Sequence, residues 1–384
     1  MTSRVLVVGG GIAGFGVARA LALRGIACTV AERLPASSPS GQGINLPANA
    51  VRALGVLGVS DEVVRSGVPI RRREYRRQSG ALLFEVDEEG FWGDVGPSVC
   101  LRRAVLADIL RTDTSSPAAG APVNVRWGRA VVRADPGEAT VRVQMESGVV
   151  EEYGYVIGAD GIHSAVRPGV QRHVRVRPSV MTAAAWRFVV PNPGVDCWTA
   201  WSGRRGTLLL IPVDERCVYG YASATRGDSD VDQPRWLEST FADFPGQVRT
   251  AVTSALADRS NLYFSEVEEV YAERWTRNRI ALIGDAAHAM GPVWAQGAAL
   301  ALEDGLVLAE LLAGRSDWGG VGAEFEQTRR PRVAHVQAAT DKMSRIASLP
   351  TWVRDGVGPM LGPRAYRDAY GPLLTSVLGD RAGD

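Results

Sequence analysis

The chain has 384 residues, with 43 Lys and Arg against 42 Asp and Glu, for a formal net charge of +1. A chain of this length can bury a large core and suggests about two domains. Its balanced charge gives no reason to expect binding to nucleic acid or to an anionic membrane.

The four cysteines, Cys28, Cys100, Cys197 and Cys217, show neither metal-site nor disulfide-framework spacing. We therefore expect free thiols, no metal site and a reducing, cytoplasmic location. No apolar run is long and clean enough to cross a bilayer, so a soluble protein with no membrane contact is predicted.

A strand, a glycine turn and a helix are predicted at the start of the chain. The apolar run 5–8 leads into the spacing Gly9-x-Gly11-x-x-Gly14 and then into a helical pattern. Gly9 suits the turn, Gly11 lets the backbone approach a pyrophosphate, and Gly14 lets helix and strand pack closely. The helix N-terminus would then face the anion. A second apolar run ends at Glu32, at the right distance to hydrogen-bond a ribose hydroxyl.

A turn-rich segment, 34–46, leads to a helix near 48–54. It is either a glycine loop that enters the site from the side or a surface connection. Residues 70–92 alternate on both sides of a Gln-Ser-Gly turn and predict a hairpin. Its basic and acidic residues are interpreted as a solvated face with pairs across the hairpin. These residues are Arg71, Arg72, Arg73, Arg76, Arg77, Glu85, Asp87, Glu88 and Glu89.

A helix is predicted over 101–110, with Arg103 near its start. A cation there is poorly placed against the helix dipole unless an anion such as a phosphate lies beside it. An ordinary surface arginine is the alternative. Residues 111–122 predict a surface loop, and four strands are predicted after it, at 123–127, 130–134, 140–145 and 149–153.

The next apolar strand ends in Gly158-Ala159-Asp160-Gly161, which places a carboxylate at the carboxyl end of a strand. Residues 170–270 change in character and predict strands of an antiparallel sheet in a second domain. Tyr219 and Tyr221 share one face of a strand, and Trp186 and Phe188 share a face of another. The sequence leaves open whether these aromatic pairs belong to the hydrophobic core or line a ligand site.

An apolar strand that ends in a glycine turn, as at the start of the chain, is predicted again at 279–288, where the strand ends in Gly284-Asp285. A helix over 298–312 follows, and its N-terminus would direct a positive dipole beyond Gly297. The remainder, 324–384, is predicted to be helical with a Pro-rich tail packed along the first domain.

Taken together, Gly9-x-Gly11-x-x-Gly14, Gly158-Ala159-Asp160-Gly161 and Gly284-Asp285-Ala286-Ala287-His288 resemble the fingerprints of the single-component FAD-dependent aromatic hydroxylases, the para-hydroxybenzoate and salicylate hydroxylase family. The resemblance implies an α/β fold with a Rossmann-like FAD-binding domain, an inserted, mainly antiparallel β-sheet substrate domain and a helical C-terminus. The implied domains are 1–70, 98–170 and 271–330 for FAD, 71–97 and 171–270 for the substrate, and 331–384 for the C-terminal segment.

The resemblance also implies roles for individual residues. Glu32 would bind the adenosine ribose, Arg103 the FAD phosphate region and Asp285 the ribityl chain. Asp160 would lie in a motif shared between FAD and the reduced nicotinamide, and the loop 292–298 would border the isoalloxazine ring. The positions predicted to bind the cofactor are Gly9, Gly11, Ile12, Ala13, Gly14, Glu32, Arg33, Gly43, Arg103, Asp160, Gly284, Asp285, Pro292, Gln296, Gly297 and Ala298.

Two positions depart from the family pattern: Ala295 replaces the first glycine of the usual Gly-Gln-Gly, and Ala299 replaces a common Asn or Gly. The extra methyl group of Ala295 is expected to narrow the loop beside the flavin. His288 is expected to have a structural role beside the cofactor, and no catalytic base is assigned.

The family activity uses NADH or NADPH and O₂ with FAD to hydroxylate an aromatic small molecule, such as a phenol, an aryl carboxylate or a polyketide. A flavin oxidase or dehydrogenase without oxygen insertion is the main alternative, and a non-enzymatic flavin-binding redox protein is another. A flavin-dependent halogenase is disfavoured because the single lysine, Lys342, lies far toward the C-terminus. Arg187, Arg204 and Arg205 would grip an acidic substrate or lie on the surface. A monomer and a homodimer both remain open.

Overall fold

The computed structural model describes residues 4–36, 42–112, 120–180, 182, 184–225, 227–347 and 349–379. A six-stranded, mostly parallel sheet in the order β20-β21-β12-β1-β2-β8 forms one half of the molecule. Its strands are β1 (Val5–Val8), β2 (Cys28–Glu32), β8 (Val123–Trp127), β12 (Tyr155–Gly158), β20 (Thr276–Arg277) and β21 (Ile280–Leu282). Since β1 pairs in parallel with β2 and β12, and β12 with β21, their carboxyl ends meet at one edge.

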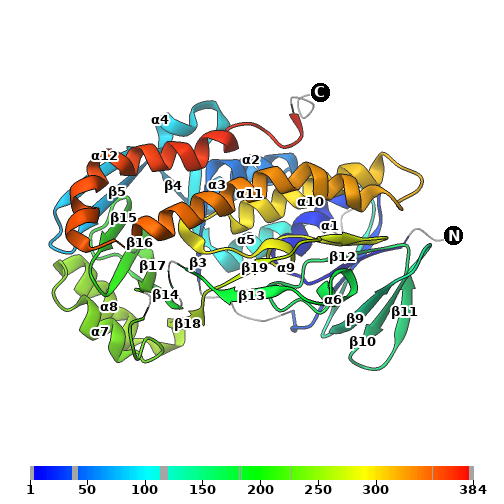
Figure 1. The fold of residues 1–384 in the computed structure, drawn as a ribbon, viewed down its shortest axis with the longest axis horizontal. Helices are drawn as coiled ribbons and strands as arrows, with labels where there is room; N and C mark the ends of the chain where they lie inside the picture. Colours follow the sequence, from blue (N-terminus) through cyan, green and yellow to red (C-terminus); the bar gives the residue numbers. More distant parts are fainter. Residues whose placement is uncertain are drawn as a thin grey trace.

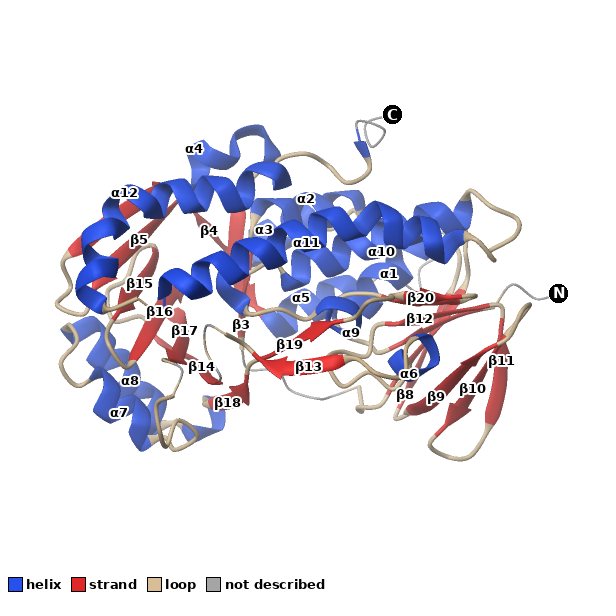
Figure 2. Ribbon diagram, viewed as in Figure 1, coloured by secondary structure: helices blue, strands red, loops and turns tan. Residues whose placement is uncertain are grey.

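Helices cover one side of this sheet (Figures 1 and 2). α1 (Ile12–Leu23) packs on α10 (Gly297–Ala313), and α10 also contacts α11 (Val321–Ala347). Glycine makes this packing close: a Cβ at Gly305 would lie 3.1 Å from the Cα of Val17. The other helices of this half are α2 (Ala48–Val56), α3 (Ser60–Ser66), α5 (Arg103–Arg111), α6 (Arg167–Val170) and α9 (Asp285–His288).

A second large sheet has seven strands, in the order β18-β14-β17-β16-β15-β5-β6. Its strands are β5 (Arg72–Arg77), β6 (Leu82–Asp87), β14 (Ala184–Pro191), β15 (Trp198–Ser202), β16 (Gly206–Pro212), β17 (Cys217–Ala224) and β18 (Tyr263–Glu266). All neighbours are antiparallel except β5 and β15. α7 (Arg235–Phe241) and α8 (Gly246–Ala257), which the sequence pattern had not indicated, bury their apolar sides with Trp186 and Phe188.

Three small sheets complete the fold. They contain β3 (Gly43–Leu46) with β7 (Ser98–Arg102) and β4 (Val68–Ile70), then β9 (Val131–Pro136) with β10 (Val141–Met145) and β11 (Val150–Tyr153), and finally β13 (Arg175–Pro178) with β19 (Glu268–Tyr271). The strand β3 corrects the expectation of a turn-rich segment up to residue 46, because its backbone pairs with β7. Part of that segment, 37–41, and part of the expected loop at 111–122 lie outside the described residues.

Several predicted boundaries differ from the structure, and two of them have a clear physical reason. The helix expected from 101 begins at Arg103, because Leu101 and Arg102 pair with β3. The hairpin expected to end at 92 stops at Asp87, whose side chain caps α4 (Glu88–Trp92) by accepting a hydrogen bond from Gly90.

The interpretation of the hairpin charges as a solvated face was also wrong in part. Arg72 does pair across the hairpin with Glu85 at 3.5 Å. However, Arg73 and Glu88 are 2% and 0% exposed, and the Arg73 Nε lies 2.5 Å from a Glu88 carboxylate oxygen. The reason is tertiary, because α12 (Thr351–Tyr370) covers this part of the hairpin.

The C-terminal helices divide between the two halves. α11 packs on α10, as expected for a tail along the first domain, whereas α12 packs on β6 and leads to the short turn η5 (Gly371–Leu373). A Cβ at Gly362 of α12 would lie 2.2 Å from the ring of Phe84, which explains the close approach. Among the residues described, no helix has both the length and the hydropathy needed to span a bilayer.

Candidate active site

A cavity of about 640 Å³ lies where the carboxyl ends of β1, β2 and β12 face the seven-stranded sheet. Its volume is in the usual range for cofactor and ligand sites. The three glycine and aspartate turns singled out in the sequence converge on it. The predicted positions in its wall are Gly9, Gly11, Ile12, Ala13, Glu32, Arg33, Gly43, Arg103, Asp160, Asp285, Pro292, Gly297 and Ala298.

The N-terminus of α1 opens into this cavity. Its N-cap residue, Gly11, provides no side-chain cap, and the first turn has no acidic residue, so the first amides of the helix are available to an anion. A Cβ at Gly11 would meet nothing within 4 Å. Gly9 differs, because it has φ +102° and a Cβ there would lie 2.4 Å from the carbonyl oxygen of Ala159.

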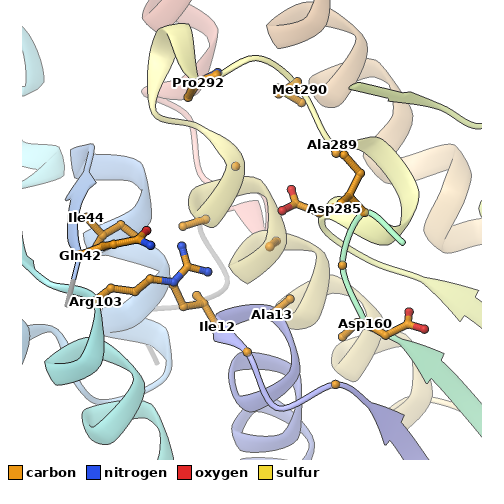
Figure 3. A pocket seen from close by; sticks show the side chains of 18 of the residues that line it. Ile12, Ala13, Gln42, Ile44, Arg103, Asp160, Asp285, Ala289, Met290 and Pro292 are labelled. Atoms are coloured by element: carbon orange, nitrogen blue, oxygen red, sulfur yellow. The ribbon is translucent and has the colours of Figure 1, made fainter. Parts of the chain in front are cut away.

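Charged side chains lie on opposite sides of the cavity (Figure 3). Figure 3 shows Arg103, at the start of α5, and Asp285, at the start of α9, reaching toward the cavity from opposite sides. The Arg103 guanidinium makes no hydrogen bond or ion pair within the described part of the chain. The Glu32 carboxylate accepts hydrogen bonds from the backbone of Gly10 at 2.5 Å and Leu34 at 2.8 Å, and these bonds fix its orientation at the end of β2.

Asp160 points away from the cavity centre in Figure 3, although it forms part of the wall. One carboxylate oxygen accepts from the backbone N–H groups of Ala165 at 2.7 Å and Val166 at 3.2 Å. The other oxygen is buried and has no partner among the described residues. Burial raises the pKa of Asp160 above its usual range, against the effect of the hydrogen bonds it accepts.

Three predicted positions lie outside the cavity wall: Gly14, Gly284 and Gln296. Gly14 serves packing, because a Cβ there would lie 1.8 Å from the carbonyl oxygen of Gly9. Gly284 has φ +58°, and its N–H donates to Asp304 at 3.0 Å. Gln296 is 2% exposed and exchanges two 3.0 Å hydrogen bonds with Asn49 of α2.

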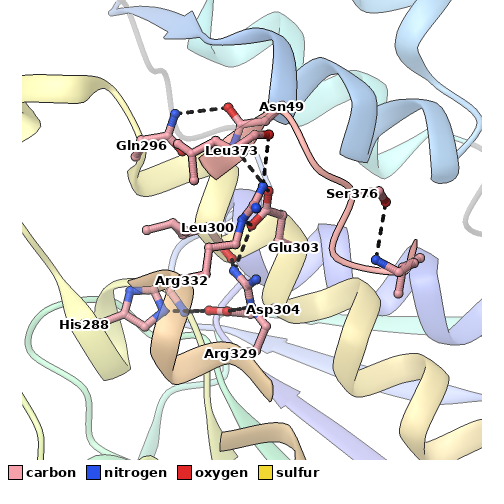
Figure 4. A network of polar contacts seen from close by, with 12 residues as sticks. Asn49, His288, Gln296, Leu300, Glu303, Asp304, Arg329, Arg332, Leu373 and Ser376 are labelled. Atoms are coloured by element: carbon pink, nitrogen blue, oxygen red, sulfur yellow. Dashed lines mark hydrogen bonds and ion pairs between the residues drawn. The ribbon is translucent and has the colours of Figure 1, made fainter. Parts of the chain in front are cut away.

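A buried polar network holds the loop between α9 and α10 from behind (Figure 4). Asp304 of α10 accepts from Gly284, from the Nε2 of His288 at 2.7 Å and from the Nε of Arg329 at 2.8 Å. Glu303 accepts from Arg329 at 3.0 Å, from Arg332 and from Asn49. His288 is therefore a structural anchor of the loop, and its ring does not line the cavity.

Ala295 occupies the left-handed region at φ 52° and ψ 30°, which explains why a glycine suits this position. We predict that Ala295→Gly raises the free energy of unfolding by about 1 kcal/mol, because it removes the clash that a Cβ causes in this conformation. Chemical denaturation of the purified protein measures the change. The matched control is Ala334→Gly, at an exposed position in the interior of α11, which should lower stability by about 1 kcal/mol. A loss of stability in both variants would contradict this interpretation.

The seven-stranded sheet supplies the far wall of the cavity, named here the substrate chamber: Arg187, Trp198, Leu209, Ile211, Tyr219 and Tyr221. Two features decide which aromatic residues belong to the core and which line the cavity. Side chains alternate between the two faces of each strand, and α7 and α8 cover one of those faces. On β14, Trp186 and Phe188 face the helices, whereas Arg187 between them faces the cavity. Arg204 and Arg205 do not line it.

The sequence did not identify several residues of the substrate chamber, among them Trp198, Leu209 and Ile211. The alternation of polar and apolar residues along a strand does not show which face of the strand helices will cover. Throughout the described residues, no group of His, Cys, Asp and Glu is arranged to hold a metal ion, and all four cysteines are free.

A protein-family model described as an FAD binding domain matches residues 2–342. The chain belongs to this family. 2-Heptyl-3-hydroxy-4(1H)-quinolone synthase of Pseudomonas aeruginosa is 30% identical over 97% of this chain and 98% of its own length. 3-Amino-4-hydroxybenzoate 2-monooxygenase of Streptomyces cremeus is 33% identical over 90% of this chain and 88% of its own.

Two solved structures share the fold. 2-Methyl-3-hydroxypyridine-5-carboxylic acid oxygenase superposes with a TM-score of 0.80 at 25% identity, covering 98% of this chain and 97% of that one. HpxO of Klebsiella pneumoniae, solved with FAD and uric acid, gives 0.83 at 24% identity over 98% and 97%. The resemblance to FAD-dependent aromatic hydroxylases is thus confirmed, as are the α/β fold class, the FAD cofactor and the assignment as a monooxygenase.

Proposed function

We propose that this monooxygenase holds FAD along the cavity and hydroxylates an aromatic compound with an anionic or hydrogen-bond-accepting group in the substrate chamber. NADH or NADPH and O₂ are the co-substrates. The observation that carries the proposal is one continuous cavity that joins an uncapped helix N-terminus to an aromatic wall containing a half-buried arginine.

The residues present fit the cofactor. The open space above the Cα of Gly11 and the free amides of α1 suit a pyrophosphate, and the unpaired Arg103 supplies a cation for it. Glu32, fixed by two backbone N–H groups, retains lone pairs for ribose hydroxyls. Asp285 would hold the ribityl chain, and the N-terminus of α10 would stabilise negative charge on the ring. Bound FAD supplies electron transfer from the nicotinamide and activation of O₂.

The substrate chamber can orient an aromatic ring and exclude water from it. Arg187 lies over the ring of Tyr221, with its guanidinium carbon 5.3 Å from the ring centroid, and donates to the Oγ of Ser265. The Tyr221 hydroxyl and the Trp198 indole N–H are buried and have no partner in the described chain, so a ligand acceptor would satisfy them. Burial raises the pKa of Tyr219 to about 12, which keeps its hydroxyl protonated at neutral pH.

The relatives support an aromatic substrate, because their names specify a quinolone and an aminohydroxybenzoate. The four free cysteines, three of them buried, support a reducing compartment such as the cytoplasm. No observation favours the oxidase alternative or the non-enzymatic one.

The test is a substrate panel. Purified protein should be yellow, and one member of a panel of phenols, aryl carboxylates and quinolones should accelerate NAD(P)H oxidation and yield a product heavier by one oxygen atom. Peroxide release without an oxygenated product would favour the oxidase alternative. A colourless protein that FAD does not reconstitute would remove the proposal.

For an anionic substrate found in this way, Arg187→Gln should raise KM about tenfold, because one charge-assisted hydrogen bond is lost while the cavity keeps its shape. Steady-state kinetics measures KM and kcat separately. Arg204→Gln is the control and should leave KM unchanged, because Arg204 is exposed in the turn between β15 and β16 and does not line the cavity. An equal effect of both substitutions would exclude Arg187 as a substrate contact.

A further inference from the structure

A second cavity of about 200 Å³ lies between α11 and α12, behind the turn that borders the large cavity. Its wall is largely apolar, with one charged pair at the rim, where the Nζ of Lys342 lies 3.3 Å from a carboxylate oxygen of Asp368. The wall of this second cavity includes Trp294, His335, Ala339, Lys342, Met343 and Ala365.

The size and surface of this cavity suit a single aromatic ring. An engineered cavity of about 150 Å³ with apolar walls is known to bind benzene, so about 200 Å³ leaves room for a ring and one substituent. The Met343 side chain adds a polarizable sulfur, which contacts aromatic rings favourably. Lys342 at the rim, with 63% of its side chain exposed, would tolerate an anionic substituent.

An unpaired donor belongs to the same wall. Trp294 is 6% exposed, and its indole Nε1 is buried without a hydrogen-bond partner in the described chain. Buried indole N–H groups usually have hydrogen-bond partners, so an acceptor on a bound molecule would satisfy this one. The nearby His335 is held by its own bond, because its Nε2 donates to the carbonyl oxygen of Ala369 at 3.0 Å, and its ring makes no hydrogen bond with the indole N–H.

The turn that carries Trp294 connects the two cavities. Pro292, Val293 and Ala295 line the large cavity, whereas Trp294 lines the second one. The hydroxyl of Tyr370 in α12 donates to the carbonyl oxygen of Trp294 at 2.6 Å. Ala295 holds the turn in the left-handed region, which alanine rarely adopts, so the turn is strained at the point where the two cavities meet. This strained turn is the element on which occupancy of the second cavity would act.

We propose that the cavity between α11 and α12 is an effector site for a single-ring aromatic molecule with a hydrogen-bond acceptor, such as a phenol. The acceptor pairs with the Trp294 N–H, and occupancy biases the turn 292–295. The effect on turnover rests on the proposed function, whereas binding in the second cavity does not.

Ala339→Phe tests the site by filling the cavity from α11, and Ala334→Phe is the matched control at an exposed position of the same helix outside the cavity. FAD-loaded protein is titrated with 4-fluorophenol and followed by fluorine NMR. Wild type and Ala334→Phe should share one saturable binding event that Ala339→Phe loses by at least about tenfold in affinity. Identical titrations of the three proteins would overturn the proposal.

Crystals soaked in 4-bromophenol locate the ligand. A bromine anomalous peak beside Trp294 in wild type, absent in Ala339→Phe, is expected. No peak there, or a peak with no saturable event in solution, which would mean binding at crystal concentration only, would overturn the proposal. Trp294→Phe should weaken 4-fluorophenol about five- to tenfold more than fluorobenzene, because both ligands lose the same ring contacts and only the phenol also loses the N–H donor.

The coupling is read from turnover. With the substrate identified by the panel, 4-fluorophenol should change kcat in wild type and Ala334→Phe by about fivefold or more, and leave Ala339→Phe unaffected. An equal response of all three would place the phenol in the substrate chamber and overturn the effector role. A wild-type protein without FAD would refute the proposed function, while the titrations would still decide whether the second cavity binds.

Discussion

Gly11→Val should give a folded protein that fails to retain FAD. Gly11 has φ −84° and ψ −168°, an extended backbone that valine adopts readily, and a Cβ there meets nothing within 4 Å. The apoprotein should therefore keep its stability. The added side chain would occupy the space in front of the α1 amides, where we place the pyrophosphate. FAD affinity should fall by at least about a hundredfold, or about 2.7 kcal/mol.

Flavin absorbance per mole of protein and titration of the apoprotein with FAD measure this loss, and thermal unfolding of the apoprotein reports the fold. Gly246→Val is the control, because a Cβ at Gly246 of α8 also meets nothing and the position lies outside the cavity. Gly14→Val should instead prevent folding, since its Cβ would overlap the Gly9 carbonyl. A Gly11→Val protein with wild-type FAD content would refute the placement of the pyrophosphate at α1.

Asp304→Asn should destabilise the protein by about 3–5 kcal/mol, the usual consequence of removing one partner from a buried ion pair. Asp304 is 0% exposed, and its carboxylate is the shared acceptor for Gly284, His288 and Arg329. The substitution leaves the Arg329 charge without this partner and frees the loop between α9 and α10. Urea unfolding of the FAD-free protein measures the effect separately from cofactor binding.

The control is Glu310→Gln on the same helix, whose side chain is 62% exposed and pairs with Arg24. An exposed pair contributes less than about 1 kcal/mol, so this variant should unfold near wild type. Equal unfolding midpoints for Asp304→Asn and Glu310→Gln would show that the buried network does not hold the loop.

The Asp304 carboxylate also predicts how the stability of the folded protein changes at acid pH. Burial raises the pKa of Asp304, but the charges of His288 and Arg329 outweigh burial and bring it from 3.8 to about 2. A depressed folded-state pKa gives stability that is fully present above the unfolded value and is lost as the pH falls from about 4 through about 2. Over this range wild type should lose stability more steeply than Asp304→Asn.

The sequence alone determined the elements whose signals are local. The spacing of Gly9, Gly11 and Gly14 specified a strand, a turn and a helix, because close approach at those positions excludes side chains. The strand at 123–127 was predicted with its observed ends. The family fingerprints likewise depend on residues within a few positions of one another, which is why FAD and the monooxygenase activity could be predicted.

Only the tertiary structure decided which side chains are buried and which residues they contact. Arg73 is buried because α12, far away in sequence, packs on β6 and places Tyr366 and Tyr370 against the guanidinium. Glu88 balances its charge. Gln296, predicted as a cofactor-binding position, exchanges two side-chain hydrogen bonds with Asn49 of α2 and does not line the cavity, an arrangement that depends on a helix far away in sequence. Because side chains alternate between the two faces of a strand, the sequence placed Tyr219 and Tyr221 on the same face. Only the position of α7 and α8 on the opposite face of the sheet assigned these two residues to the substrate chamber. A residue's own neighbours in the chain fix its backbone and its side of a strand, whereas the free energy of burying it depends on segments that arrive from elsewhere.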